Sequence, residues 1–99
     1  MNYAVSFAPT ATADLEDVFD YIAGNSGERI ARNYVAEIYG YCLGLDTFPH
    51  RGTGRDDLLP GLRLVGFKHQ ATIAFLIEDT NVFIIRVFYG GRDIRFSDE

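Results

Sequence analysis

Arginine side chains in the second half of the sequence are the residues best suited to chemistry with an anion. The chain carries a formal net charge of −5, and residues 1–50 hold only two basic side chains against seven acidic ones. Residues 51–99 hold seven of each sign, and six of their seven basic side chains are arginine. Because a guanidinium is a rigid planar fork that matches carboxylate and phosphate groups, we expect an anionic partner to meet this half. Ordinary surface ion pairs are an equally good interpretation of any single arginine.

The sequence lacks the usual motifs of metal-binding, nucleotide-binding and acyl-transfer sites. His50, His69 and Cys42 are the only imidazole and thiol side chains, and they lack the spacing of a zinc site. The glycines of residues 51–55 lack the lysine and the strand-loop-helix context of a P-loop, and no serine stands in a GxSxG motif. We therefore expect no metal site and no cofactor.

Acidic side chains in the first half are expected to be solvated. Asp14, Glu16, Asp17 and Asp20 fall on the polar side of a helical pattern, where a solvent-facing role is the simplest interpretation. The acidic balance also argues against general affinity for nucleic acid, which calls for a basic surface. We expect no direct sequence-specific DNA binding by this chain alone.

These groups must be positioned by a small α+β framework. Alternating apolar residues predict an opening strand over residues 2–8. Helical spacing predicts helices over residues 11–22 and 28–47, joined through Gly24 to Gly27. The pattern then predicts three strands, at residues 62–67, 70–78 and 81–89. The order β-α-α-β-β-β places a helical hairpin on a mostly antiparallel sheet, in a single domain that spans residues 1–99.

The predicted last strand is apolar on both faces, which is typical of a central strand or of a face that awaits a partner. Strict alternation puts Ile85, Val87 and Tyr89 on one face with Phe83, and Arg86 on the other with Val82, Ile84 and Phe88. Residues 50–57 are expected to form an exposed loop. The predicted core consists of Leu15, Val18, Ile22, Tyr34, Ile38, Leu45, Ile73, Phe75, Ile85 and Val87.

The sequence favours a cytoplasmic location away from membranes. The longest apolar run, residues 82–87, is interrupted by Arg86 and is far shorter than the ~20 residues that cross a bilayer. Cys42 is the single cysteine and cannot form an internal disulfide, which fits a reducing compartment.

A series of short motifs runs along nearly the whole chain. In order they are Ala8-Pro9, Ala11, Asp14-Leu15, Tyr21-Ile22, Ala31, Tyr34-Val35, Phe48-Pro49, Gly52, Arg55, Asp57-Leu58, Pro60-Gly61-Leu62-Arg63, Ile85-Arg86-Val87, Gly90 and Arg92-Asp93. Each motif is weak alone. Their order and intervals resemble those of the ParE branch of the RelE/ParE toxins.

The resemblance implies a bacterial toxin of a type II toxin–antitoxin pair, encoded on a plasmid or a chromosome. Such a toxin poisons DNA gyrase by binding, without being an enzyme, and is silenced by a tightly bound ParD-like antitoxin. We expect an amphipathic antitoxin segment to fill a hydrophobic groove beside exposed helix aromatics such as Phe19 and Tyr39. The candidate target-binding residues are Arg63, Arg86, Tyr89, Arg92 and Arg95, with Arg92 and Arg95 ranked highest because a terminal segment reaches outward.

Two positions depart from the ParE pattern and keep an alternative open. Ala8 stands where the family often has serine, which removes a helix cap worth about 1 kcal/mol. Tyr89 stands where ParE toxins often have histidine, and a tyrosine there is similar to the RelE branch, whose members cleave messenger RNA on the ribosome. Metal-free RNA cleavage needs a base, an acid and cations on the phosphate. Five side chains would supply such a set if they converge: Arg63, Lys68, Arg86, Tyr89 and Arg92. A RelE-like endoribonuclease is therefore the alternative.

Arg86 and Tyr89 also have simpler structural interpretations. Arg86 would pair with an acid such as Glu78 across the hairpin. Tyr89 would complete the core with its hydroxyl group at the rim.

Overall fold

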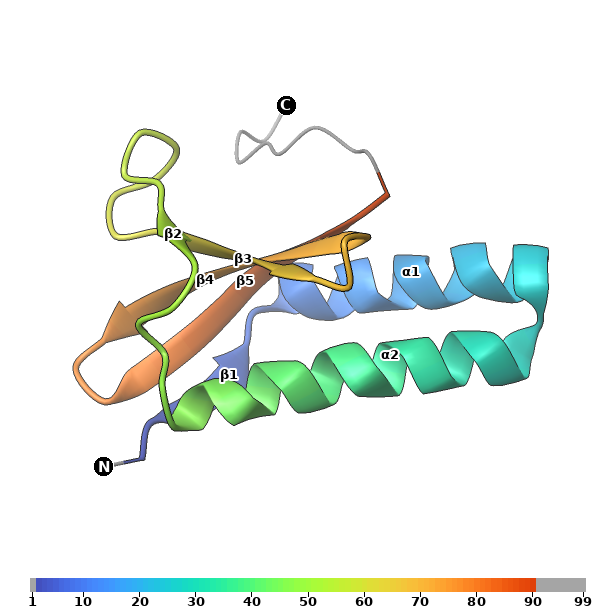
Figure 1. Cartoon of the computed structure of the whole chain (residues 1–99), viewed down its shortest axis with the longest axis horizontal. Coiled ribbons are helices and arrows are strands. Elements are labelled where there is room, and N and C mark those ends of the chain that lie inside the picture. The colour runs from blue at the N-terminus through green and yellow to red at the C-terminus, as the bar shows by residue number, and fades with distance from the viewer. Residues whose placement is uncertain (1, 91–99) are drawn as a thin grey trace.

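The protein consists of a five-stranded sheet with two helices on one face (Figure 1). The computed structural model describes residues 2–90. The strands lie in the order β1 (Ala4–Phe7), β5 (Asn81–Tyr89), β4 (Ala71–Glu78), β3 (Arg63–Phe67) and β2 (Thr53–Gly54). Strand β1 is parallel to β5, and the other neighbours are antiparallel. The predicted order β-α-α-β-β-β on a mostly antiparallel sheet is confirmed, and β2 is an additional strand within the predicted loop.

The helical hairpin is formed by α1 (Pro9–Ser26) and α2 (Glu28–Leu43). Helix α1 begins at Pro9, whose missing N–H is tolerated in the first turn, and Ala8 provides no side-chain cap. It continues through Gly24 to Ser26, so the predicted end was too early. Gly27, with φ of 101°, lets the chain reverse in a single residue. Helix α2 ends earlier than predicted and is followed by the 3₁₀ turn η1 (Gly44–Asp46).

The register of β5 shifts by one residue at Ile85. Arg86 lies opposite Ala74 and Ile84 lies opposite Phe75, so Ile85 has no partner of its own in β4. This bulge reverses the alternation that a regular strand would keep. Val82 and Ile84 face the helices before the bulge, and Val87 faces them after it. The predicted alternation was therefore wrong in the first half of the strand.

Two apolar layers cover the two faces of the sheet. The helix-side layer joins α1, α2 and the sheet through residues such as Leu15, Ile38 and Phe75. The opposite layer consists of Leu62, Ala74 and Phe88, with partly buried Leu58, Leu59, Leu64, Leu76 and Ile85. Eight predicted core residues are buried: Leu15, Val18, Ile22, Ile38, Leu45, Ile73, Phe75 and Val87. Tyr34 is only half-buried, and Ile85 is half-buried on the helix-free face because of the bulge.

Helix α1 takes the place of β1 along the outer edge of β5. Strand β1 pairs with β5 only as far as Ile84, where the Ala8 N–H donates to the Ile84 carbonyl at 2.8 Å. One residue further, the Thr10 hydroxyl donates to the Ile85 carbonyl at 2.6 Å. The start of α1 therefore covers the strand edge that β1 leaves open, as an exposed edge requires.

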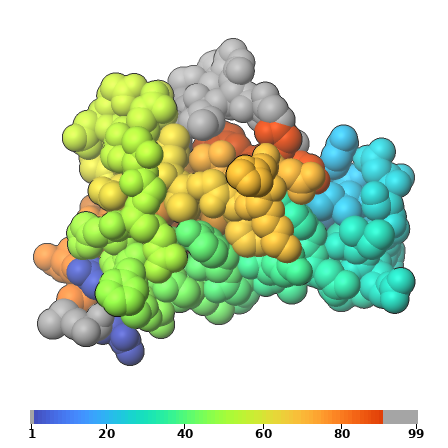
Figure 2. All heavy atoms as spheres, viewed as in Figure 1, coloured from blue at the N-terminus to red at the C-terminus, as the bar shows by residue number. Residues whose placement is uncertain are grey.

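The two ends of the molecule differ in character. Residues 50–60 stand out as a lobe on one side, and the turn between the helices lies at the opposite end (Figure 2). The Cα radius of gyration is 13.3 Å. None of the helices within residues 2–90 has the length and apolar character needed to cross a membrane.

Candidate functional site

Arg63 begins β3 and is held against the preceding loop. Its Nε–H donates to the Arg51 carbonyl at 3.0 Å, and its Nη2 lies 3.5 Å from the Gly52 carbonyl. The side chain is half-buried, on the same side of β3 as Val65 and Phe67. Main-chain oxygens thus fix the guanidinium and leave its charge without a carboxylate partner among residues 2–90.

The loop before β3 is shaped by two glycines. Gly52 has φ of +79°, and a Cβ there would lie 2.2 Å from the Leu64 carbonyl oxygen, so only glycine fits. Gly61, with φ of +83°, donates its N–H to Asp56 Oδ1 at 2.8 Å. Arg55 forms two parallel hydrogen bonds with Asp57, each 2.9 Å long. These contacts give the segment a defined structure although it contains only the two-residue strand β2.

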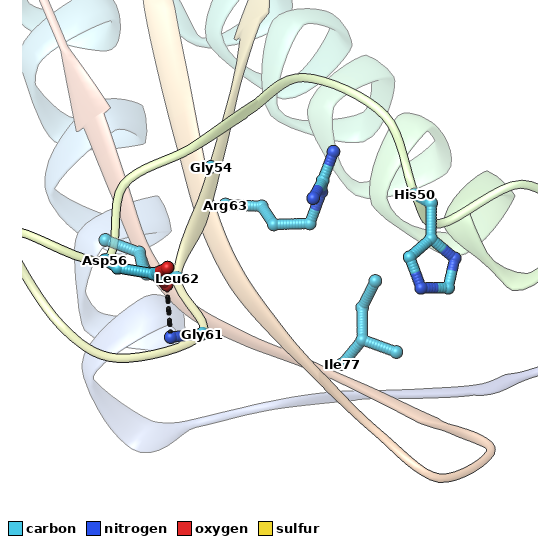
Figure 3. A pocket seen from close by; sticks show the side chains of 7 residues that line it. All are labelled: His50, Gly54, Asp56, Gly61, Leu62, Arg63 and Ile77. Atoms are coloured by element: carbon cyan, nitrogen blue, oxygen red, sulfur yellow. Dashed lines mark hydrogen bonds between the residues drawn. The ribbon is translucent and has the colours of Figure 1, made fainter.

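A hollow of about 220 Å³ opens between this loop and the sheet (Figure 3). Arg63 and His50 lie on two sides of it, and Ile77 lies between them. The Asp56–Gly61 hydrogen bond forms the far wall. The complete lining is His50, Gly54, Asp56, Gly61, Leu62, Arg63 and Ile77. The hollow combines the half-buried guanidinium of Arg63, the carboxylate of Asp56 and apolar surface from Ile77.

Arg86 is paired with Asp14 of α1. Its Nε–H donates to Asp14 Oδ2 at 2.7 Å and its Nη2 to Oδ1 at 3.1 Å. Asp14 Oδ2 also accepts the buried Val87 N–H at 2.8 Å. These hydrogen bonds raise the pKa of the Arg86 guanidinium above its already high usual value. The carboxylate therefore joins the first turns of α1 to the bulge of β5.

This pair corrects two expectations from the sequence. Asp14 is not solvated, because only 7% of its side chain is exposed. The structural interpretation of Arg86 as one half of an ion pair was correct in kind, but the partner is Asp14 and not Glu78. The guanidinium also lies over the Phe88 ring at 4.9 Å, on the helix-free face. Arg86 therefore faces a different environment from Arg63.

Tyr89 lies on the helix side among other tyrosines. Its ring meets Tyr34 edge-on at a centroid distance of 5.5 Å and lies 5.8 Å from the ring of Tyr21. It is half-buried and packs against both helix-side clusters, which agrees with the structural interpretation from the sequence. The Tyr34 hydroxyl is buried without a hydrogen-bond partner in the described part of the chain. Burial, followed by the nearby Tyr89 and Glu37, raises the pKa of Tyr34.

The candidate residues do not form one cluster within residues 2–90. Arg63 and Lys68 lie at opposite ends of β3 and its following turn, and Lys68 pairs with Glu37 of α2 at 2.6 Å. Arg86 faces the helix-free side, whereas Tyr89 faces the helices. Arg92 and Arg95 lie outside the described residues. No three His, Cys, Asp or Glu side chains of residues 2–90 form a group that could hold a metal ion.

Sequence reasoning missed His50, Asp56 and Asp14 as parts of these arrangements. His50 and Asp56 were assigned to an exposed loop, and nothing in their local pattern indicates a hollow. Asp14 did carry a signal: it stands one residue before the buried Leu15, four residues after Thr10, so both polar groups lie on the strip of α1 that meets β5.

Several large apolar side chains remain exposed. They are Tyr21, Ile30, Tyr39, Leu43 and Phe48, each with more than two-fifths of its surface accessible. Tyr39 stacks on Phe7 of β1 with a centroid distance of 5.0 Å. Its expected exposure is confirmed, whereas Phe19 is half-buried within a core cluster.

Comparison with known proteins agrees with this architecture. A family model described as the ParE toxin of the parDE type II toxin–antitoxin system matches residues 5–94. Toxin ParE3 of Caulobacter vibrioides is 30% identical over 79 residues, which cover 80% of this chain and 78% of that protein.

Solved structures show the same fold at lower identity. A chain of the chromosomal ParDE toxin–antitoxin system from P. aeruginosa has a TM-score of 0.77 at 21% identity, covering 89% of this chain and 96% of that one. A chain of the RelBE2 toxin–antitoxin complex from Mycobacterium tuberculosis has a TM-score of 0.65 at 22% identity, covering 90% and 99%. A chain of the YoeB–YefM complex from Staphylococcus aureus has a TM-score of 0.56 at 16% identity, covering 90% of this chain and 98% of that one. This chain belongs to the ParE family of type II toxins.

Proposed function

We propose that this toxin inhibits DNA gyrase by binding to it and is neutralised by a ParD-like antitoxin. On this proposal the chain acts as one domain over residues 1–99, in the cytoplasm, and catalyses no reaction of its own. Family membership supports the toxin role directly. The target and the antitoxin are inferences from the ParE resemblance and from the geometry of the candidate residues.

The observation that carries the proposal is the separation of the candidate catalytic groups. General acid–base cleavage of RNA requires a proton acceptor, a proton donor and a cation within hydrogen-bond reach of one phosphate. Lys68 and Arg86 are each paired with a carboxylate, and Arg63 is distant from Lys68 along β3. Separate cationic and aromatic positions favour a binding surface over an active site, since arginine and tyrosine anchors dominate interface energies.

Exposed apolar side chains support a protein partner such as an antitoxin. Tyr39 and Leu43 are exposed one turn apart on α2, and Tyr39 stacks on Phe7 of the edge strand β1. A segment with an apolar stripe would bury this surface. The structure from M. tuberculosis described above is a toxin–antitoxin complex, and the one from S. aureus is a complex of YoeB with YefM.

The two candidate targets are separated by one pair of assays on the purified chain. One arm offers gyrase and relaxed plasmid, and the other offers translating ribosomes with messenger RNA. We expect loss of supercoiling and accumulation of gyrase-cleaved DNA in the first arm, and intact messenger RNA in the second.

Tyr89→Phe is the diagnostic variant for the alternative, because it removes a hydroxyl and keeps the ring that packs on Tyr34. An inhibitor that uses Tyr89 as an aromatic contact should retain most of its potency. RNA cuts at codon positions that disappear in this variant would establish the RelE-like nuclease and overturn our proposal.

The antitoxin is tested by co-expression with the adjacent short reading frame. We expect a ribbon-helix-helix protein with a C-terminal amphipathic segment that co-purifies with the toxin and restores gyrase activity. A purified toxin that remains harmless and monomeric, and that binds no such product, would contradict this part of the proposal.

A further inference from the structure

Arg63 is a half-buried cation that lacks a counter-ion. Arg55, Lys68 and Arg86 each pair with a carboxylate, whereas Arg63 contacts only main-chain carbonyls within residues 2–90. Withdrawing a cation from water is unfavourable unless an anion or hydrogen-bond acceptors replace the water. The two carbonyls replace part of it, and they do not neutralise the charge.

The orientation of Arg63 leaves donors available to a ligand. A guanidinium has five N–H groups, and the contacts with the Arg51 and Gly52 carbonyls occupy two of them. The side chain borders the hollow, with the His50 ring on another side (Figure 3). Gly52 directly precedes Thr53, which pairs with Leu64, so the pairing of β2 with β3 places the two carbonyls beside Arg63. A fixed fork is suited to two parallel hydrogen bonds with a planar carboxylate.

The rest of the lining favours a carboxylate on an aliphatic stem over a phosphate. Ile77 offers apolar surface to methylene groups. Asp56 lines the same hollow, and its negative charge repels an incoming anion. The repulsion is stronger for a dianionic phosphate than for a singly charged carboxylate. The net charge of −5 further disfavours a polyanionic partner.

The geometry points to this hollow as a receptor for one glutamate or aspartate side chain on the surface of a protein partner of the toxin. This inference rests on the proposed function in one respect, namely that the partner is a protein. Arg63 supplies the bidentate contact, His50 lies beside it as a second polar contact, and Ile77 contacts the stem of the incoming side chain.

The test is a titration of the isotope-labelled full chain observed by NMR, at constant ionic strength. The probes are N-acetylglutamic acid α-amide, its neutral match N-acetylglutamine α-amide, and inorganic phosphate. We expect saturable shifts of the Arg63 Nε–H and His50 ring signals with the glutamate compound only. The shifts should vanish in Arg63→Gln and persist in Arg29→Gln, which removes an equal charge from an exposed position of α2.

The same variants are then compared as gyrase inhibitors. Because a lost charge-assisted hydrogen bond weakens binding by roughly 10- to 100-fold, Arg63→Gln should lose at least tenfold in potency and Arg29→Gln should match the wild type. The titration contains no gyrase, so it tests the carboxylate site even if the toxin does not inhibit gyrase. The gyrase assay on the wild-type chain likewise tests the proposed function even if no carboxylate binds in the hollow.

Several results would overturn the inference. Absence of a saturable shift with the glutamate compound, or an equal shift with the glutamine compound, would each do so. Tighter binding of phosphate would assign the hollow to nucleic acid. If Arg63→Gln does not fold, the comparison of the three probes on the wild-type chain still decides.

Discussion

Replacing Asp14 with alanine removes the carboxylate that joins α1 to the bulge of β5. Three hydrogen bonds are lost at once, two from Arg86 and one from the Val87 N–H. We expect α1 to be held less firmly along the outer edge of β5, where the Thr10 hydroxyl would keep its hydrogen bond to the Ile85 carbonyl.

The magnitude follows from the burial of each group. A buried N–H without a partner costs about 1–3 kcal/mol, and the Val87 N–H is in that position. Breaking a fully buried ion pair costs about 3–5 kcal/mol, but 29% of the Arg86 side chain is exposed and its head can turn toward water, so its share is smaller. We expect the free energy of unfolding to fall by about 2–4 kcal/mol, a large part of the stability of a small domain.

Urea unfolding followed by circular dichroism measures this loss. In Asp14→Asn the free energy of unfolding should fall by less, about 1–2 kcal/mol, because the amide oxygen can still accept a hydrogen bond from the Val87 N–H. A double-mutant cycle with Arg86→Met should give a coupling energy of about 1–2 kcal/mol. Asp17→Ala, an exposed carboxylate on the same helix, is the control and should change stability by about 0.5 kcal/mol or less.

The reasoning is refuted if Asp14→Ala is no more destabilising than Asp17→Ala. A coupling energy near zero would be equally decisive, because it would mean that Asp14 and Arg86 behave as a solvated surface pair.

Three further predictions concern single residues. Burial raises the pKa of the Cys42 thiol from 9.0 to about 12, so the unfolded thiol ionises first, and stability should fall by about 1.4 kcal/mol per pH unit between these values. Urea unfolding at several alkaline pH values should show that the free energy of unfolding decreases less steeply with pH in Cys42→Ala than in the wild type. Tyr34→Phe removes a buried hydroxyl without a partner in the described chain, so it should leave stability unchanged or raise it by about 1 kcal/mol, and a larger loss would reveal an acceptor. Gly52→Ala should destabilise by about 1–3 kcal/mol and speed amide exchange at Arg55, whereas Gly54→Ala, which has open space, should not.

Periodicity was sufficient to predict most of the framework. Strand β5 was predicted with its observed bounds, and the helix-side core residues of α1, such as Leu15 and Val18, followed from spacing alone. Local pattern carries this information because burial of one face imposes the period of the element. Helix α1 extends beyond its predicted end at residue 22 because Gly24 can remain helical at a moderate energetic cost.

The candidate site was less predictable because it depends on contacts between distant segments. The bulge at Ile85 is followed by contacts of Arg86 and Val87 with Asp14, 72 and 73 positions earlier in the chain, and no local pattern indicates them. The environment of Arg63 likewise depends on a loop whose path is set by one close approach, between Gly52 and Leu64. Sequence identified Arg63, Arg86 and Tyr89 as notable residues and put Arg86 and Tyr89 on opposite faces, but it could not give the partners of Arg63 and Arg86.

The bulge of β5 also affects how this fold can change during evolution. Ile85 and Arg86 are successive residues that both face the helix-free side, and the strand then resumes its alternation. Deleting Ile85 would restore a regular strand and leave Val87 and Tyr89 facing the helices. Loss of a single codon there would thus keep the side chains on their present faces, whereas loss of a codon in a regular part of the strand would turn all the side chains on one side of it to the opposite face. Relatives that are one residue shorter at this point can therefore present the same surfaces on the same framework.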